Sequence, residues 1–139
     1  MSSEVVDRFF AAMSAGDLET VRTVFHEDVV STDFATGQTL TGIEANMADV
    51  QNWQATFSDL KVEAVRHTVS GNTVVTEMKF EGTNDGDMPA PDGSVIPATG
   101  KRVQMQGCQV CEFKDGKMIG ARQYYDMMGM MAQLGLMGP

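Results

Sequence analysis

The chain has 139 residues, a length typical of one domain, and it carries 10 basic against 19 acidic side chains, a net charge of −9. This acidic balance, with Lys101-Arg102 as the only adjacent basic pair, argues against nucleic acid as a partner. No apolar run approaches the ~20 residues of a membrane span, no secretory signal is visible, and two cysteines fit a reducing compartment. We therefore expect a cytoplasmic protein in which residues 1–139 form one domain.

Three amphipathic helices are predicted in the first part of the chain. Apolar residues recur at helical spacing from the N-terminus to Gly16, and Asp17 is placed to cap a second, shorter helix. A short strand is predicted over residues 29–34. After Gly42 a third helix carries an apolar stripe with Trp53 at its edge. Each apolar face must then pack against a sheet or a partner.

Two antiparallel hairpins are predicted in the second part, where the apolar period changes to two. Residues 60–69 and 73–82 form the first, and residues 103–113 and 118–125 form the second, across an Asp-Gly turn. The segment 83–100 between them is rich in proline and glycine and is long for a loop, as lids often are. A terminal helix rich in methionine is predicted after Asp126, which is placed as its N-cap.

This order of elements, helices first and a curved antiparallel sheet second, predicts an α+β fold with the helices packed on one face of the sheet. Long strands twist strongly, and glycines at positions such as Gly107 and Gly120 allow a sheet to bend. A bent sheet around helices leaves a cone with an apolar interior that is open at one end.

The sequence also resembles a known family. The residues that carry the resemblance are Thr99-Gly100-Lys101-Arg102-Val103, Phe113-Lys114-Asp115-Gly116-Lys117-Met118-Ile119, Arg122-Gln123-Tyr124-Tyr125-Asp126-Met127-Met128-Gly129 and Gln133-Leu134-Gly135. In order and spacing they resemble the SnoaL-like polyketide cyclase and ester cyclase family. The resemblance implies the cone-shaped fold of the nuclear transport factor 2-like superfamily, a homodimer formed through the open sheet face, and a hydrophobic pocket inside the cone.

The resemblance also implies where catalytic residues would lie. Cyclases of this family use an aspartate on the last strand and a histidine on the preceding strand, and these positions are occupied by Gln123 and Gln109 in this chain. A carboxamide does not change its protonation state, so it cannot replace a general base. Hydratase and lyase members of the superfamily use an aspartate-histidine pair, which suggests Asp33 with His67 as an alternative.

The candidate catalytic residues are therefore His67, Asp33 and Gln123. His67 lies in strand register and imidazole titrates near neutrality, although a histidine held in the core or at an interface fits the same pattern. Asp33 is either a partner for His67 or a solvated loop residue. The candidate substrate-binding residues share apolar or strand-face positions: Gln109, Tyr125, Trp53, Met105 and Met78. The two glutamines with Tyr125 would offer hydrogen bonds in the pocket, or else form a polar patch at the dimer face.

Two further patterns have simpler interpretations. Cys108 and Cys111 have the spacing of redox and zinc sites, but on a strand residues three apart point to opposite faces, so no metal site is expected. The methionines of the terminal helix either fill the core, cover the pocket or pack on a second subunit.

The sequence is compatible with two functions. The first is a cofactor-free cyclase-, isomerase- or hydratase-type enzyme that acts on a small hydrophobic carbonyl compound. The second is a non-catalytic protein that binds an apolar small molecule in the cone.

Overall fold

The computed structural model describes residues 2–90 and 92–137. In chain order its elements are α1 (Ser2–Ala15), α2 (Leu18–Val24), β1 (Phe25–Asp33), β2 (Gln38–Thr41), α3 (Ile43–Thr56), β3 (Lys61–Ser70), β4 (Thr73–Thr83), β5 (Met88–Pro89), β6 (Val95–Ile96), β7 (Arg102–Lys114), β8 (Lys117–Tyr125) and α4 (Met127–Gln133).

The main sheet has six strands in the order β2-β1-β8-β7-β4-β3. Both predicted hairpins are confirmed: β3 pairs with β4 and β7 pairs with β8, each antiparallel. The strand β2, which folds back on β1, was not predicted from the sequence, and neither was the parallel pairing of β1 with β8. The strand predicted over residues 29–34 begins earlier, at Phe25.

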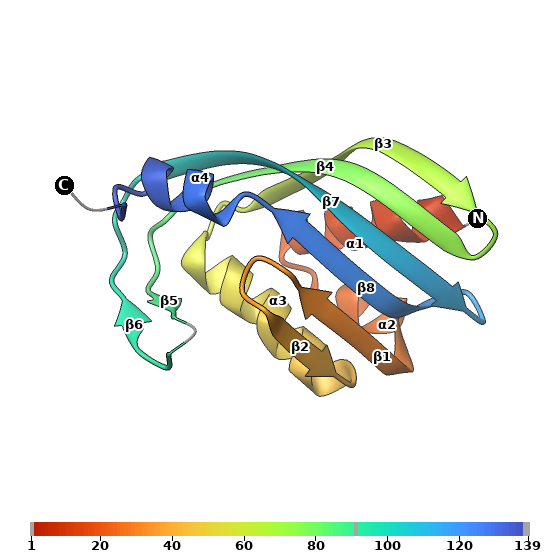
Figure 1. Ribbon diagram of the computed structural model, residues 1–139. Helices are drawn as coiled ribbons and strands as arrows, with labels where there is room; N and C mark the ends of the chain where they lie inside the picture. The colour runs from red at the N-terminus through yellow and green to blue at the C-terminus, as the bar shows by residue number, and fades with distance from the viewer. Residues whose placement is uncertain (1, 91, 138–139) are drawn as a thin grey trace.

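The helices α1, α2 and α3 lie on one side of the curved sheet, as Figure 1 shows. Their apolar stripes meet the inner face of the strands in one core, whose fully buried members include Val6, Val21, Phe57, Val74 and Val103. This arrangement confirms the predicted α+β fold. Burial of roughly 20–25 such side chains supplies the main driving force for folding.

Two predicted helix N-caps, Asp17 and Asp126, are confirmed. The Asp17 carboxylate accepts a hydrogen bond from the Thr20 N–H at 3.2 Å, and the Asp126 carboxylate accepts one from the Gly129 N–H at 2.9 Å. Each cap satisfies a backbone donor that the first turn of a helix leaves without a partner. Asp126 therefore has the structural role expected for it.

The long segment between β4 and β7 is fixed to the end of α3 by Asn84, which is fully buried. The Asn84 amide donates to the carbonyl oxygens of Thr56 and Gly86, and its side-chain oxygen accepts from the Thr99 N–H at 2.9 Å. At Gly86 a Cβ atom would lie only 1.8 Å from the carbonyl oxygen of Ala55. Only glycine allows this close approach of the two backbones.

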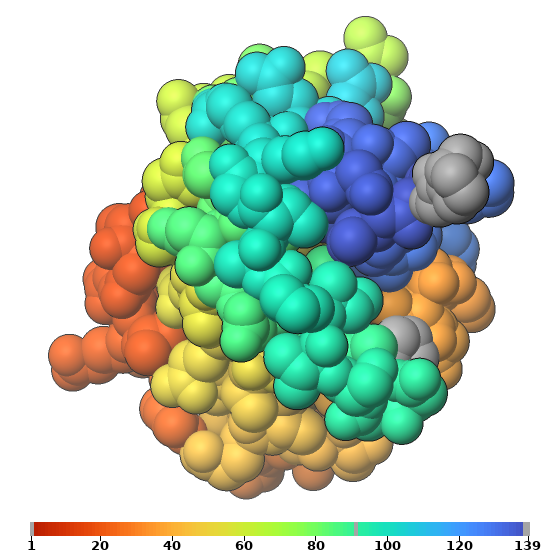
Figure 2. Space-filling view, turned by 90° about the vertical axis from the view of Figure 1, so that its left-hand side faces the viewer, coloured from red at the N-terminus to blue at the C-terminus, as the bar shows by residue number. Residues whose placement is uncertain are grey.

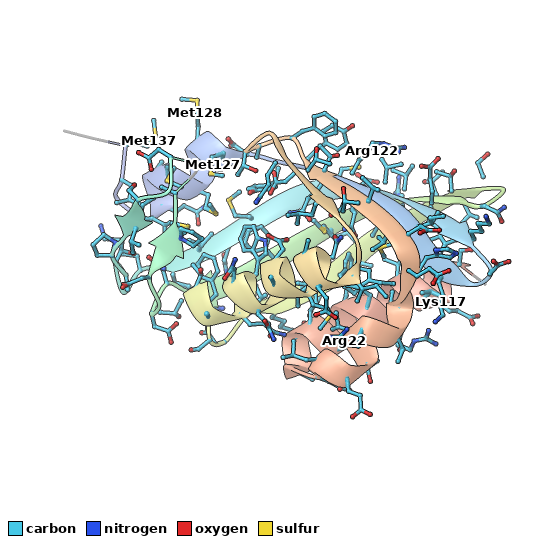
Figure 3. The ribbon with its side chains drawn as sticks, turned by 90° about the horizontal axis from the view of Figure 1, so that it is seen from below. Arg22, Lys117, Arg122, Met127, Met128 and Met137 are labelled. Carbon is cyan, nitrogen blue, oxygen red and sulfur yellow. The ribbon has the colours of Figure 1, made fainter. Side chains whose placement is uncertain are left out.

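This segment and α4 close one end of the molecule, the face seen in Figure 2. The side chains of Met130 on α4 and of its C-cap Leu134 are buried. Met128 of the same helix is 67% exposed and points away from the fold (Figure 3). The Gln133 side chain joins α4 to β7 by hydrogen bonds to the backbone of Gln104. The methionine-rich helix thus both fills the core and leaves an apolar outer side.

None of the described helices is both long and apolar enough to cross a membrane.

Candidate functional site

A cavity lies between the inner face of the sheet and the helices α1 and α3. It offers about 80 Å³ to the centres of water molecules, which is room for several waters or for a small ligand. Most of its wall is apolar, and the aromatic residues in it are Phe9, Phe10, Phe25, Trp53 and Phe80. Its polar lining residues are Ser31, Thr32, Asp33, Asn46, Asp49, Gln109 and Gln123.

A row of polar residues crosses the inner face of the sheet in register. Across neighbouring strands His67 pairs with Thr76, Thr76 with Gln109, Gln109 with Gln123, and Gln123 with Asp33. Side chains at paired positions point to the same face of a sheet, so this row interrupts the apolar interior. Four of its five members were singled out in the sequence, and pairing across five strands aligns them.

Asp33 ends this row at the edge of the cavity. Its carboxylate accepts hydrogen bonds from the Tyr125 hydroxyl at 3.0 Å and from the backbone N–H groups of Ala35 and Thr36. Burial, together with the charge of Asp33 and this hydrogen bond, raises the pKa of Tyr125 well above its usual value. Tyr125 therefore remains a hydrogen-bond donor that orients Asp33, which is not a solvated loop residue.

Asp49 is a site residue that the sequence analysis missed. It lies on α3, partly buried in the cavity wall, where burial and then the negative charge of Asp33 raise its pKa to about 6. A hydrogen bond from Trp53 acts in the opposite direction. Asp49 precedes Trp53 by four residues, a spacing that places both on one face of a helix. This spacing was the signal in the sequence that could have identified Asp49 as a site residue.

Gln109 lies at the centre of the polar row and is only 6% exposed. Its side-chain oxygen Oε1 is buried, and within the described residues no donor reaches it. A buried acceptor without a partner destabilises the fold, and a donor from a water or a ligand in the cavity would remove this cost. Gln123 lies beside it on β8 and also lines the cavity.

The predicted pair of Asp33 with His67 is not formed. His67 lies at the opposite end of the polar row, where its Nδ1 contacts the Thr76 hydroxyl at 2.8 Å and its Nε2 contacts the Asp7 carboxylate of α1 at 2.8 Å. It does not line the cavity. Both ring nitrogens are thus occupied by protein partners, an arrangement that holds α1 against β3.

Some of the predicted substrate-binding residues line the cavity and others do not. Trp53 and Met78 line the cavity. The Tyr125 ring packs edge-on against Trp53, with 5.9 Å between centroids, although Tyr125 is directed at Asp33. Met105 is buried but lies beneath α4, where the Gln133 amide contacts its sulfur at 3.7 Å, and it does not line this cavity.

The two cysteines are free thiols on β7. Cys111 faces the core and burial raises its pKa to about 12, which leaves it unreactive at neutral pH, while Cys108 is only partly buried. In the described part of the chain, no three His, Cys, Asp or Glu residues are placed to hold a metal ion.

Together, the curved sheet, the three covering helices and the cavity between them define a protein of the nuclear transport factor 2-like, or ketosteroid isomerase-like, fold. Residues 4–134 match the family described as SnoaL-like polyketide cyclase. The chain belongs to this family.

Solved structures agree with this assignment of the fold. A protein from Jannaschia sp. CCS1, provisionally named as a SnoaL-like polyketide cyclase, superposes with a TM-score of 0.85 at 23% identity, over 99% of this chain and 93% of that one. A Catenulispora acidiphila protein with a ketosteroid isomerase-like fold, in complex with trimethylamine, gives 0.80 at 20% identity, over 96% and 93%. An LEH-like epoxide hydrolase from M. tuberculosis gives 0.74 at 22% identity, over 96% and 88%. No match was found among the curated protein sequences.

Proposed function

We propose that this protein is a cofactor-free enzyme that moves a proton at the carbon next to the carbonyl group of a small hydrophobic compound, as cyclase-, isomerase- and hydratase-type reactions require. The observation that carries the proposal is the Asp49 carboxyl, whose burial beside Asp33 raises its pKa to about 6. A general base is most effective when its pKa lies near the working pH.

In the proposed step the ionised Asp49 takes the proton from the α-carbon. The C–H bond breaks, its electron pair forms the enolate, and the negative charge moves to the carbonyl oxygen. The side-chain amides of Gln109 and Gln123, which line the same cavity, donate hydrogen bonds to that oxygen. Protonated Asp49 then returns the proton to the product. In this role the glutamines stabilise charge and need not titrate.

Asp33 and Tyr125 act through Asp49. The charge of Asp33, held in place by the Tyr125 hydroxyl, helps to raise the pKa of Asp49 and so makes it a stronger base. The apolar ring of the substrate would pack on Trp53 and Met78. His67 has no proton-transfer role in this proposal, because its nitrogens contact Thr76 and Asp7.

The test is exchange of the α-protons of cyclohexanone in D₂O, followed by proton NMR, which detects proton abstraction without the natural substrate. We expect the protein to accelerate exchange with a rate that rises with pH around an apparent pKa of about 6. Asp49→Asn should lose the acceleration, whereas Asp28→Asn, an exposed aspartate on β1, should keep it. Exchange no faster than in buffer, or unchanged in Asp49→Asn, would overturn the proposal.

A second function has one specific observation in its favour. The unpartnered Gln109 oxygen would suit a protein that holds a hydrogen-bond donor of a small molecule without reacting with it. In that case a compound captured by the protein would be recovered unchanged after prolonged incubation, and substitutions in the polar row would alter affinity alone.

We further propose that the protein is a cytoplasmic homodimer that contacts its partner through the outer sheet face. Val30, Phe34 and Tyr124 are exposed there, and the rings of Phe34 and Tyr124 stack at 4.8 Å. Large exposed apolar patches often mark interfaces between subunits. Light scattering after size-exclusion chromatography should give a dimer for the protein and a monomer for Tyr124→Glu; a monomer for both would refute this.

A further inference from the structure

The cavity has two carboxylates and no basic side chain in its wall. Asp33 and Asp49 are its charged lining residues, and none of the described lysines, arginines or histidines lines it. Arg22, Lys117 and Arg122 lie on the outside of the fold, as Figure 3 shows. The cavity therefore carries negative charge that no protein cation balances from within.

The protein stabilises the charges of the two carboxylates differently. Asp33 accepts three hydrogen bonds, from the Tyr125 hydroxyl and two backbone N–H groups. Asp49 has the Trp53 hydrogen bond, and burial still raises its pKa to about 6. Once ionised, Asp49 is thus an incompletely compensated charge at the edge of an apolar space, where a cation would be attracted most strongly.

Gln109 provides a second and independent observation. Gln109 lines the cavity and is only 6% exposed. Its buried Oε1 is a hydrogen-bond acceptor that no donor of the described chain reaches. The Ser31 hydroxyl and the Asn46 amide of the same cavity wall donate elsewhere, to Asn46 Oδ1 and to the carbonyl oxygens of Leu40 and Gly42. An N–H or O–H group of a ligand in the cavity would supply the donor that this oxygen lacks.

We propose that the ligand of this cavity carries a protonated amine, which donates a hydrogen bond to Gln109 Oε1 and pairs with the Asp49 carboxylate. Organic ammonium groups are also attracted to aromatic rings such as Trp53, which lines the same wall. The inference goes beyond the proposed function, because a carboxylate that pairs with an ammonium group has a lowered pKa and is a weaker base. It describes a ligand that Asp49 binds through its charge and does not deprotonate.

The pH dependence of this binding follows from the groups that face Asp49. On β1 the charge of Asp33 raises the pKa of Asp49, and on β8 the charge of Asp49 helps to raise the pKa of the Tyr125 hydroxyl. Arg22 of α2 pairs with Glu44, and the neighbouring strands β2 and β5 carry no charged residue. Amine binding should therefore strengthen as pH rises through about 6 and Asp49 loses its proton.

The experiment compares cyclohexylammonium chloride with cyclohexanol, which has the same ring and a neutral hydroxyl donor, by isothermal titration calorimetry at constant ionic strength. At about pH 8 we expect the amine to bind about tenfold more tightly than the alcohol or better. The preference should shrink as the pH is lowered to about 5, where Asp49 is protonated. Asp49→Asn should remove both the preference and its pH dependence, while Asp28→Asn should retain both.

A cyclohexylammonium affinity no greater than that of cyclohexanol, including the absence of measurable binding by either, would overturn the inference. So would an unchanged preference in Asp49→Asn. This outcome is distinguishable from failure of the proposed function, because the exchange experiment uses a neutral ketone and measures proton transfer, whereas the titration uses unreactive compounds and measures binding alone.

Discussion

Replacing Asp49 by asparagine should stabilise the protein at neutral and alkaline pH. In the folded protein, burial and then the charge of Asp33 raise the pKa of Asp49 from 3.8 to about 6. The ionised carboxylate is thus less stable in the fold than in the unfolded chain. Asparagine keeps an oxygen that can accept the Trp53 hydrogen bond but has no charge to bury, so it removes this cost.

The magnitude follows from the difference between the two pKa values. A pKa that rises from 3.8 to about 6 corresponds to roughly 3 kcal/mol of unfolding free energy. As the pH falls below the pKa of the unfolded chain, 3.8, the carboxyl becomes protonated in both states and the cost disappears. Between about pH 4 and pH 6 the folded state binds more protons than the unfolded state, so stability falls as pH rises, and above that range the full cost persists.

Urea unfolding of both proteins between about pH 4 and pH 8 measures this effect. We expect the two midpoints to differ little near pH 4 and the variant midpoint to lie about 1–2 M higher near pH 8. Asp28→Asn, at an exposed position, serves as the control and should change stability by less than about 0.5 kcal/mol at every pH. A difference between Asp49→Asn and the parent that is independent of pH, or a less stable variant at pH 8, would refute the reasoning.

Three further substitutions test other parts of the site and its support. Gln109→Met should raise the free energy of unfolding by about 1 kcal/mol, because it removes a buried acceptor without a partner. The control Gln106→Met, at an exposed position of the same strand, should not raise it. Thermal unfolding measures both variants, and a destabilised Gln109→Met would contradict the burial of this acceptor. His67→Ala should lower the free energy of unfolding by about 1–3 kcal/mol, because it leaves the buried Thr76 hydroxyl without its partner. The variant should still accelerate exchange of the cyclohexanone α-protons. Loss of that acceleration in a folded variant would show that His67 takes part in proton transfer. Gly86→Ala should destabilise by about 1–3 kcal/mol, since its Cβ would lie 1.8 Å from a helix carbonyl oxygen, and equal urea midpoints would contradict that contact.

Much of the fold could be predicted because local chemistry determines it. The Asp-Gly turn at Asp115 requires a left-handed backbone, observed as a φ of 55°, and this turn defines the register of the last hairpin. Asp17 and Asp126 cap their helices through their own side chains. The strands β4 and β7 follow from apolar residues at alternate positions. The strand β2, by contrast, has one half-buried residue and no buried one, so its sequence carried no such pattern.

The candidate site could likewise be predicted only in part from the sequence. The sequence by itself determined which residue types were available, and Asp33, Gln109, Gln123 and Tyr125 were recognised as candidates from their positions on strands. Only the tertiary structure decided how they combine, because β1 pairs with β8 in parallel and brings Asp33 beside Gln123, while His67 falls at the far end of the same row. The raised pKa of Asp49 likewise depends on burial and on a charge from another element. Neither distance nor burial is encoded at a single position, since both arise when segments far apart in the chain pack together.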